Sequence, residues 1–100
     1  MAILIKWTNE ARITFDKNIS YLLKEWTERE IKNFVKQTHH ILQRIENQPE
    51  MFRPSQKSKN VRKALINKYI TLYYRYYAAR NEVILLTFWH IKQDPKKLKY

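Results

Sequence analysis

The 100-residue sequence contains no cysteine and no glycine, and each absence excludes a class of chemistry. Without cysteine there can be no disulfide, no thiolate metal ligand and no cysteine nucleophile. Without glycine there is no Walker A loop and no dinucleotide-binding fingerprint, because both need the close backbone approach to phosphate that glycine permits. We therefore expect no cofactor, and ATP, GTP and NAD are not expected as ligands.

Long hydrophobic runs are also missing. No apolar stretch approaches the roughly 20 residues that a membrane-spanning helix needs. The opening MAILIKW lacks the basic lead and the small-residue cleavage site of a signal peptide. We predict a cytoplasmic protein that does not enter a membrane. The length predicts a single domain over residues 1–100.

Acidic residues are scarce in the second half of the chain. Residues 1–50 hold eight Lys/Arg and seven Asp/Glu, for a net charge of +1. Residues 51–100 hold twelve Lys/Arg and two Asp/Glu, for a net charge of +10. Self-repulsion on this scale opposes compaction, so the asymmetry predicts an anionic partner.

The first half of the chain is typical of a helical hairpin that follows one short strand, Ala2–Lys6. Thr8 or Asn9 is suited to cap the first helix, and Thr27 with Glu30 forms a capping box that begins the second. Apolar residues recur at helical spacing in both segments. In the first they are Ala11, Phe15, Ile19, Leu22, Leu23 and Trp26, and in the second Ile31, Phe34, Val35, Ile41, Leu42 and Ile45.

The second half changes to a period of two, which is typical of strands. Residues 48–60 carry Pro49 and Pro54 and are predicted as a loop. Strands are predicted over 61–67, 71–77 and 83–90, with turns at 68–70 and 78–81. The predicted fold is α+β, in the order β-α-α-β-β-β, with the helical hairpin on one face of an antiparallel sheet.

Candidate functional residues are basic. There is no His-Glu-x-x-His, no Cys/His cluster and no carboxylate pair in the strand half, so no metal is expected. We predict a cationic surface on the sheet face opposite the helices, formed around one imidazole. Its residues are Lys57, Lys59, Arg62, Lys63, Arg75, His90 and Lys92.

Two interpretations of this surface stay open on spacing alone. Cations stabilise a phosphorane and imidazole moves protons near neutral pH, so Arg62, His90 and Lys92 are candidate catalytic residues for metal-independent RNA cleavage. The alternative is a basic face that only binds, since one histidine fills one of the two proton-transfer roles. Whether the chain is an enzyme is therefore undecided at this level.

Several segments in a fixed order resemble the RelE/ParE superfamily of bacterial type II toxins, also labelled plasmid stabilization proteins. The segments are IKWTNEA at 5–11, the helical hairpin, Pro49, VRKAL at 61–65, LYYRYY at 72–77 and VILLTFWHIKQDP at 83–95. The ending strand followed by His-x-Lys is closer to the ParE-like and plasmid-stabilization branch. The resemblance implies a toxin that forms a hetero-oligomer with a cognate antitoxin, part of which folds across the toxin.

The resemblance also implies a target, and the superfamily divides on it. ParE-like members poison DNA gyrase, whereas RelE-like members cut messenger RNA in the ribosome. Arg62 matches the superfamily's strand arginine, His90 matches a histidine common in the ParE branch, and Lys92 falls where a basic residue is usual. RelE-like enzymes carry a catalytic tyrosine in the C-terminal segment, where this chain offers only Tyr100. We expect a ParE-like toxin, with a RelE-like endoribonuclease and a non-enzymatic nucleic-acid-binding module as alternatives.

Overall fold

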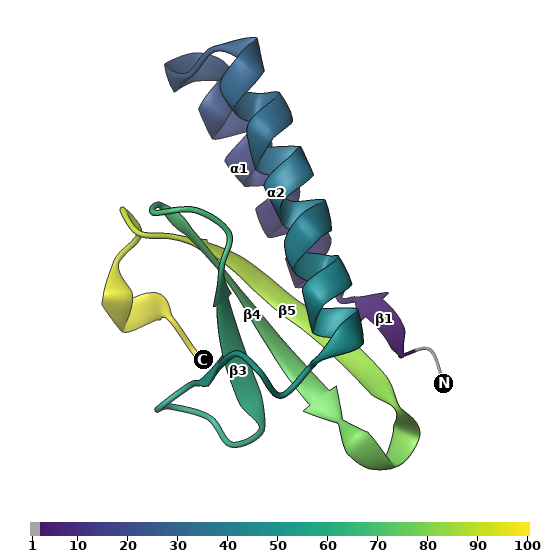
Figure 1. Ribbon diagram of the computed structural model, residues 1–100. Coiled ribbons are helices and arrows are strands. Elements are labelled where there is room, and N and C mark those ends of the chain that lie inside the picture. The colour runs from purple at the N-terminus through teal and green to yellow at the C-terminus, as the bar shows by residue number, and fades with distance from the viewer. Residues whose placement is uncertain (1–2) are drawn as a thin grey trace.

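The computed structural model describes residues 3–100, which form two long helices and a five-stranded sheet (Figure 1). The element order is β1 (Leu4–Trp7), α1 (Asn9–Glu25), α2 (Glu28–Asn47), β2 (Arg53–Pro54), β3 (Val61–Leu65), β4 (Ile70–Tyr77) and β5 (Glu82–His90). Short 3-10 turns lie at Ala78–Arg80 and Pro95–Lys97. Ala2, predicted in the first strand, lies outside the described residues.

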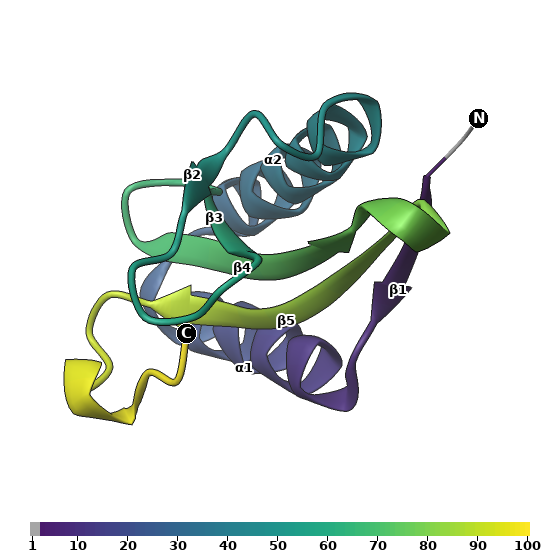
Figure 2. The same cartoon turned by 90° about the horizontal axis from the view of Figure 1, so that it is seen from below.

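The sheet has the strand order β1-β5-β4-β3-β2 (Figure 2). Strands β3 to β5 pair antiparallel, as predicted, and β2 pairs antiparallel with β3, but β1 pairs parallel with β5. Parallel pairing needs a long crossover, which the rest of the chain up to β5 supplies. The predicted α+β fold is confirmed, with two corrections. The sheet is only mostly antiparallel, and the predicted loop at 48–60 contributes the two-residue strand β2.

Both helices begin at the threonines that the sequence indicated. The Thr8 side chain accepts a hydrogen bond from the Ala11 N–H at 3.0 Å, and Thr27 accepts one from the Glu30 N–H at 3.4 Å. Each threonine thereby satisfies an amide that has no partner inside its helix. Only Trp26 and Thr27 separate the two helices, so the chain turns back sharply at this corner.

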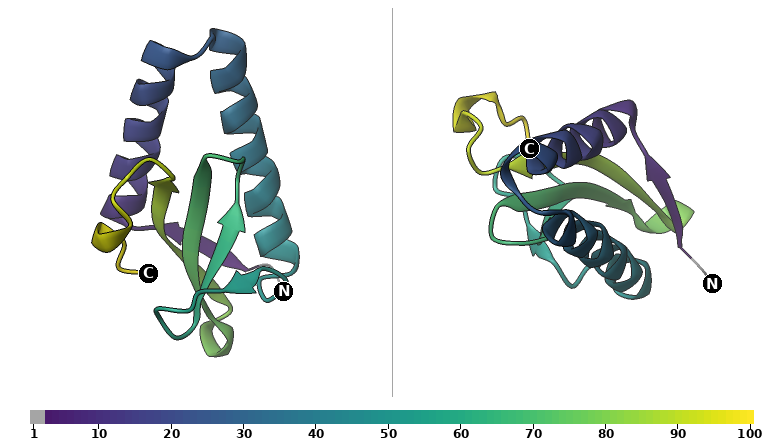
Figure 3. Two further views of the ribbon diagram at one scale, coloured as in Figure 1. Left: turned by 90° about the vertical axis from the view of Figure 1, so that its left-hand side faces the viewer. Right: turned by 90° about the horizontal axis from the view of Figure 1, so that it is seen from above.

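The two helices diverge from that corner and cover one face of the sheet. Figure 3 shows them joined at one end and spread apart at the other, with the strands visible between them. The joined end projects beyond the sheet (Figure 1), and Leu23 near that end is 65% exposed. The hairpin is therefore antiparallel as predicted, and α1 packs mainly on β5.

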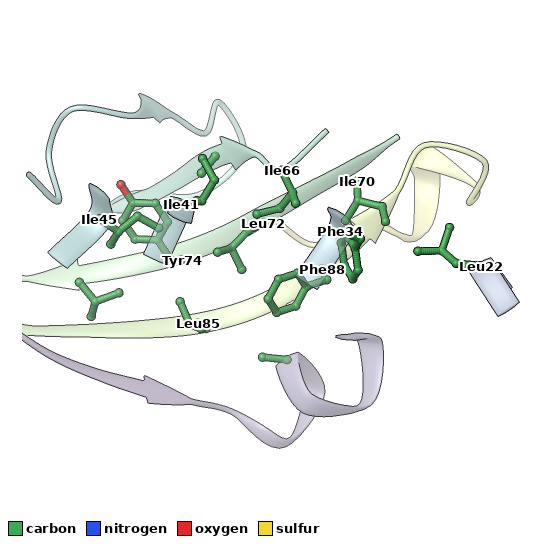
Figure 4. Packing of buried hydrophobic residues seen from close by; sticks show 13 residues of the cluster. Leu22, Phe34, Ile41, Ile45, Ile66, Ile70, Leu72, Tyr74, Leu85 and Phe88 are labelled. Carbon is green, nitrogen blue, oxygen red and sulfur yellow. The ribbon is translucent and has the colours of Figure 1, made fainter. Parts of the chain in front are cut away.

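The hydrophobic core fills the space between the helices and the sheet (Figure 4). At its centre the Phe15 ring stacks on Phe34 at 5.4 Å and meets Phe88 edge-on at 5.1 Å between ring centroids. Phe34 and Phe88 are fully buried. Burying a side chain of this size stabilises the fold by roughly 1.5–3 kcal/mol. These rings come from α1, α2 and β5, so they hold all three elements together.

A bulge in β5 changes which residues face the helices. Tyr73 pairs with Thr87, but the next residue, Tyr74, pairs with Leu85, so Leu86 is an extra residue in β5. Val83 and Leu85 therefore share the helix-covered face with Phe88, whereas Leu86 packs on the opposite face with Tyr73. The strict alternation predicted for 83–90 is wrong at this point.

Helix α1 is attached to β5 by polar side chains as well as by apolar packing. Strand β1 pairs with β5 only as far as Leu85, which leaves the β5 edge without a strand partner beyond that residue. The Phe88 N–H donates to Thr14 Oγ1 at 2.9 Å, and Asn18 Nδ2 donates to the Phe88 carbonyl at 3.1 Å. The helix thus satisfies backbone groups that would otherwise be buried without partners.

We expect Asn18→Ala to lower the free energy of unfolding by about 1–3 kcal/mol, because the buried Phe88 carbonyl loses its donor. Urea denaturation followed by circular dichroism measures this loss. Ser20→Ala changes an exposed residue of the same helix and should stay within about 0.5 kcal/mol of the parent chain. Equal losses in the two variants would show that the Asn18 hydrogen bond contributes little.

Candidate functional site

The predicted basic residues do not form one cluster. Arg62 of β3 pairs with Tyr74 in register, and Tyr74 pairs with Leu85 of β5. His90 lies five residues beyond Leu85 in β5. At the usual rise per residue of a strand, the two residues are about 15 Å apart. The predicted gathering of arginine, lysine and imidazole around one point is therefore wrong.

Arg62 lies at the end of the sheet near the β4–β5 turn. Arg62 and Ala64 are two residues apart in β3, so their side chains point to the same face of the sheet. Ala64 packs in the core under the helices, and Arg62 therefore faces the helix-covered side. Its Nη1 donates to the Phe52 carbonyl at 2.8 Å. Beside it is a depression of about 340 Å³, which Arg80 and Tyr77 also line. Arg80 lies over the Tyr77 ring, 4.2 Å from its centroid.

The opposite, open face of the sheet carries a second basic patch. Lys63 is two residues from Val61, and Arg75 is two residues from Tyr73. Side chains two apart in a strand point to the same face, so Lys63 and Arg75 lie on the open face with Val61 and Tyr73. A depression of about 380 Å³ on this side is lined by Arg53, Lys63, Leu65, Thr71 and Tyr73. The cationic side chains of this patch form a surface suited to an anionic partner.

The chain after β5 folds back over the open face. Leu98 and Tyr100 pack against the apolar residues there, and the ring centroids of Tyr100 and Tyr73 lie 6.4 Å apart. Lys57 Nζ donates to the Leu98 carbonyl at 2.9 Å, so this predicted target contact is engaged within the chain. Lys59 lies in the same loop and is exposed. Burial raises the pKa of Tyr100, which favours a neutral phenol.

His90 lies at the other end of the sheet, under α1. Its side chain is only 6% exposed, and its ring contacts Tyr21 at 5.0 Å and Tyr69 at 6.1 Å between centroids. Its Nδ1 accepts the backbone N–H of Lys92 at 3.1 Å. Lys92 Nζ in turn donates to the Tyr21 hydroxyl at 2.8 Å. Of the candidate catalytic residues, the structure brings His90 and Lys92 together and leaves Arg62 apart.

The sequence did not indicate Lys17 and Tyr21 as part of a site. Together with Asn18, His90, Lys92 and Gln93 they line a pocket of about 170 Å³, which we call the His90 pocket. Lys17 and Tyr21 are four residues apart and therefore share one face of α1. That spacing was visible in the sequence, but nothing in it places this face beside the end of β5.

Burial lowers the pKa of His90, and the neighbouring Lys92 charge lowers it further. We predict that the His90 ring titrates below its ordinary value of 6.5 in an NMR titration. Lys92→Gln should raise this pKa because it removes a positive charge, whereas Lys32→Gln on the exposed side of α2 should not. A His90 titration at or above 6.5 in the parent chain would contradict the prediction.

The sign of the effect on stability follows from the same shift. A histidine with a lowered pKa takes up its proton more readily in the unfolded chain than in the fold. The contribution of neutral His90 is therefore fully present above pH 6.5 and is lost as the pH falls toward its folded pKa. Unfolding experiments across that range should show a stability that rises with pH.

Metal and membrane features are absent from the described part of the chain. Within residues 3–100 no three His, Cys, Asp or Glu side chains come close enough to hold a metal ion. Neither helix of that range has the length and hydrophobicity that crossing a bilayer requires.

Comparison with known proteins places the chain in a family. The family described as ParE toxin of type II toxin-antitoxin system, parDE, matches residues 5–95. A solved structure described as the chromosomal ParDE TA system from P. aeruginosa matches with a TM-score of 0.73 at 15% identity. The match covers 90% of this chain and 97% of the other. No curated protein matches.

Two helices over one face of a mostly antiparallel five-stranded sheet are the fold of a ParE-like toxin. The chain belongs to the ParE toxin family of type II toxin-antitoxin systems. The predicted resemblance is confirmed at the level of this family, which implies a cognate ParD antitoxin as partner.

Proposed function

We propose that this toxin is a single domain acting in the cytoplasm and arrests growth by binding DNA gyrase, without cleaving RNA. The observation that carries the proposal is the separation of Arg62 from His90 along the sheet. Metal-independent RNA cleavage needs a base, an acid and a cation gathered around one phosphate. Arg62 and His90 line separate depressions that share no residue, so they do not surround one phosphate.

The environment of His90 also favours binding over proton transfer. Its ring is almost fully buried, and Nδ1 is already engaged by the Lys92 amide. Lys92 itself is exposed and hydrogen-bonded to Tyr21, and this bond raises the pKa of the lysine. A lysine with a raised pKa is a poor general base at neutral pH. Neither residue is prepared for the second proton-transfer role.

The partner implied by the family fits the charge of this chain. The second half carries ten excess positive charges, and the exposed basic residues are distributed over both faces of the sheet. A cognate antitoxin with an acidic or amphipathic segment would offset this repulsion when it folds across the toxin. The toxin and antitoxin then form a hetero-oligomer in which the toxin is inactive.

Inducing the chain alone in bacteria tests the gyrase proposal. We expect growth arrest with a DNA-damage response that precedes any fall in protein synthesis, while messenger RNA stays intact. If the chain is instead a ribosome-dependent ribonuclease, messenger cleavage comes first. His90→Ala should then reduce the cleavage rate by about 10²–10⁴. His39→Ala, an exposed histidine of α2, serves as the matched control, with expression of every variant confirmed.

A second candidate function, non-enzymatic nucleic-acid binding, is favoured by the depression on the open face that Arg53, Lys63 and Tyr73 line. The lysine and arginine side chains of this depression can neutralise phosphates.

If this second function operates, affinity for single-stranded RNA should fall steeply as salt rises. Lys63→Gln should reduce the slope of log affinity against log salt by about one, whereas Lys32→Gln should leave it unchanged. Filter binding across a salt series measures both slopes. Weak binding with no salt dependence would remove this candidate.

A further inference from the structure

The His90 pocket lies between α1 and the end of β5, apart from the Arg62 depression and from the open face. It has a volume of about 170 Å³ and is lined by Lys17, Asn18, Tyr21, His90, Lys92 and Gln93. Two of these six side chains carry a positive charge, and no Asp or Glu lines the pocket. Glu25, one turn further along α1, is close enough to raise the pKa of Lys92.

The tautomer of His90 follows from its one hydrogen bond. Because Nδ1 accepts the Lys92 amide, the proton of the neutral ring is on Nε2. Among residues 3–100 no acceptor bonds to Nε2, although His90 is only 6% exposed. Within residues 3–100 every fully buried side-chain nitrogen or oxygen has a partner. The Nε2–H donor is therefore reachable from the pocket.

The other polar groups of the pocket are also mainly donors. Lys92 already donates to the Tyr21 hydroxyl, so the proton of that hydroxyl is available to an acceptor other than Lys92. Lys17 is exposed on the same face of α1 and forms no ion pair with any residue in the range 3–100. The Asn18 amide is engaged by the Thr14 and Phe88 carbonyls. The two lysine charges and the His90 Nε2–H favour a ligand that accepts hydrogen bonds and carries negative charge.

We propose that the His90 pocket binds a carboxylate, supplied by an aspartate or glutamate side chain of a protein partner. One carboxylate oxygen accepts the His90 Nε2–H, and the other lies toward Lys92 and Lys17. Bonds in which the acceptor is ionised are stronger than neutral ones, and two donors fix the orientation of the planar group. A protein source is favoured over a phosphate because family membership implies a protein partner. The inference does not depend on the gyrase target.

Binding of a carboxylate should be linked to protonation of His90. A negative charge beside the ring favours the imidazolium and raises its pKa, opposing the effects of burial and of Lys92. The surroundings of the ring include the charge of Lys92, the hydroxyls of Tyr21 and Tyr69, and more distantly Glu25. Carboxylate affinity should therefore rise as the pH falls through the folded pKa of His90.

The test is an NMR titration of the full chain with N-acetylglutamate amide, which presents one carboxylate on a peptide-like frame. We expect the His90 ring signals to shift with saturation in the millimolar range and the His90 pKa to rise. Sodium chloride at the same ionic strength should produce neither change. Lys92→Gln, Lys17→Gln and Tyr21→Phe should each weaken binding about three- to tenfold, because each removes a donor facing the ligand.

Lys32→Gln removes an equal charge from the exposed side of α2 and is the matched control. If it weakens binding as much as Lys92→Gln, the effect is general attraction to a basic protein and the proposal is overturned. Absence of any shift beyond that of chloride also overturns it. Shifts with inorganic phosphate but not with the carboxylate probe would assign the pocket to phosphate and overturn the proposal. Circular dichroism confirms that each variant is folded.

Discussion

The hydrogen bonds between α1 and the edge of β5 are the constraint on which the arrangement depends. Strand β1 is four residues long and leaves the second half of the β5 edge uncovered. Thr14 and Asn18 of α1 take over the role of a neighbouring strand for the backbone of Phe88. These hydrogen bonds fix α1 along β5. The same part of α1 brings Lys17 and Tyr21 to the end of that strand. The attachment of α1 to β5 therefore determines both the core and the His90 pocket.

The helical half of the fold could be predicted closely from the sequence because its signals are local. The apolar stripes and the threonine caps specify α1 and α2 with little dependence on the rest of the chain. The strands after Val61 were also predictable from their period of two. Asn60 and Asn81 adopt positive φ angles of 63° and 52°. Asparagine tolerates this region better than most residues, so a chain without glycine can still turn at these points.

The candidate site was less predictable because its geometry depends on contacts between distant segments. In VRKAL, Val61 and Leu65 are apolar on one face and Ala64 on the other, so the sequence does not decide which face the helices cover. The structure places Arg62 on the covered side. In β5 the position of the bulge could not be predicted, because the adjacent Leu85 and Leu86 are equally suited to either face of the sheet.

The two edges of the sheet affect how the toxin behaves at high concentration. On one side the edge is the two-residue strand β2, where Pro54 has no amide to donate to an incoming strand. On the other side β1 is short and carries Lys6, which forms an ion pair with Glu82 at 3.3 Å. Neither edge strand is a long, uncharged strand with which another chain could pair. Edges of this kind disfavour the strand addition by which sheets of separate chains join.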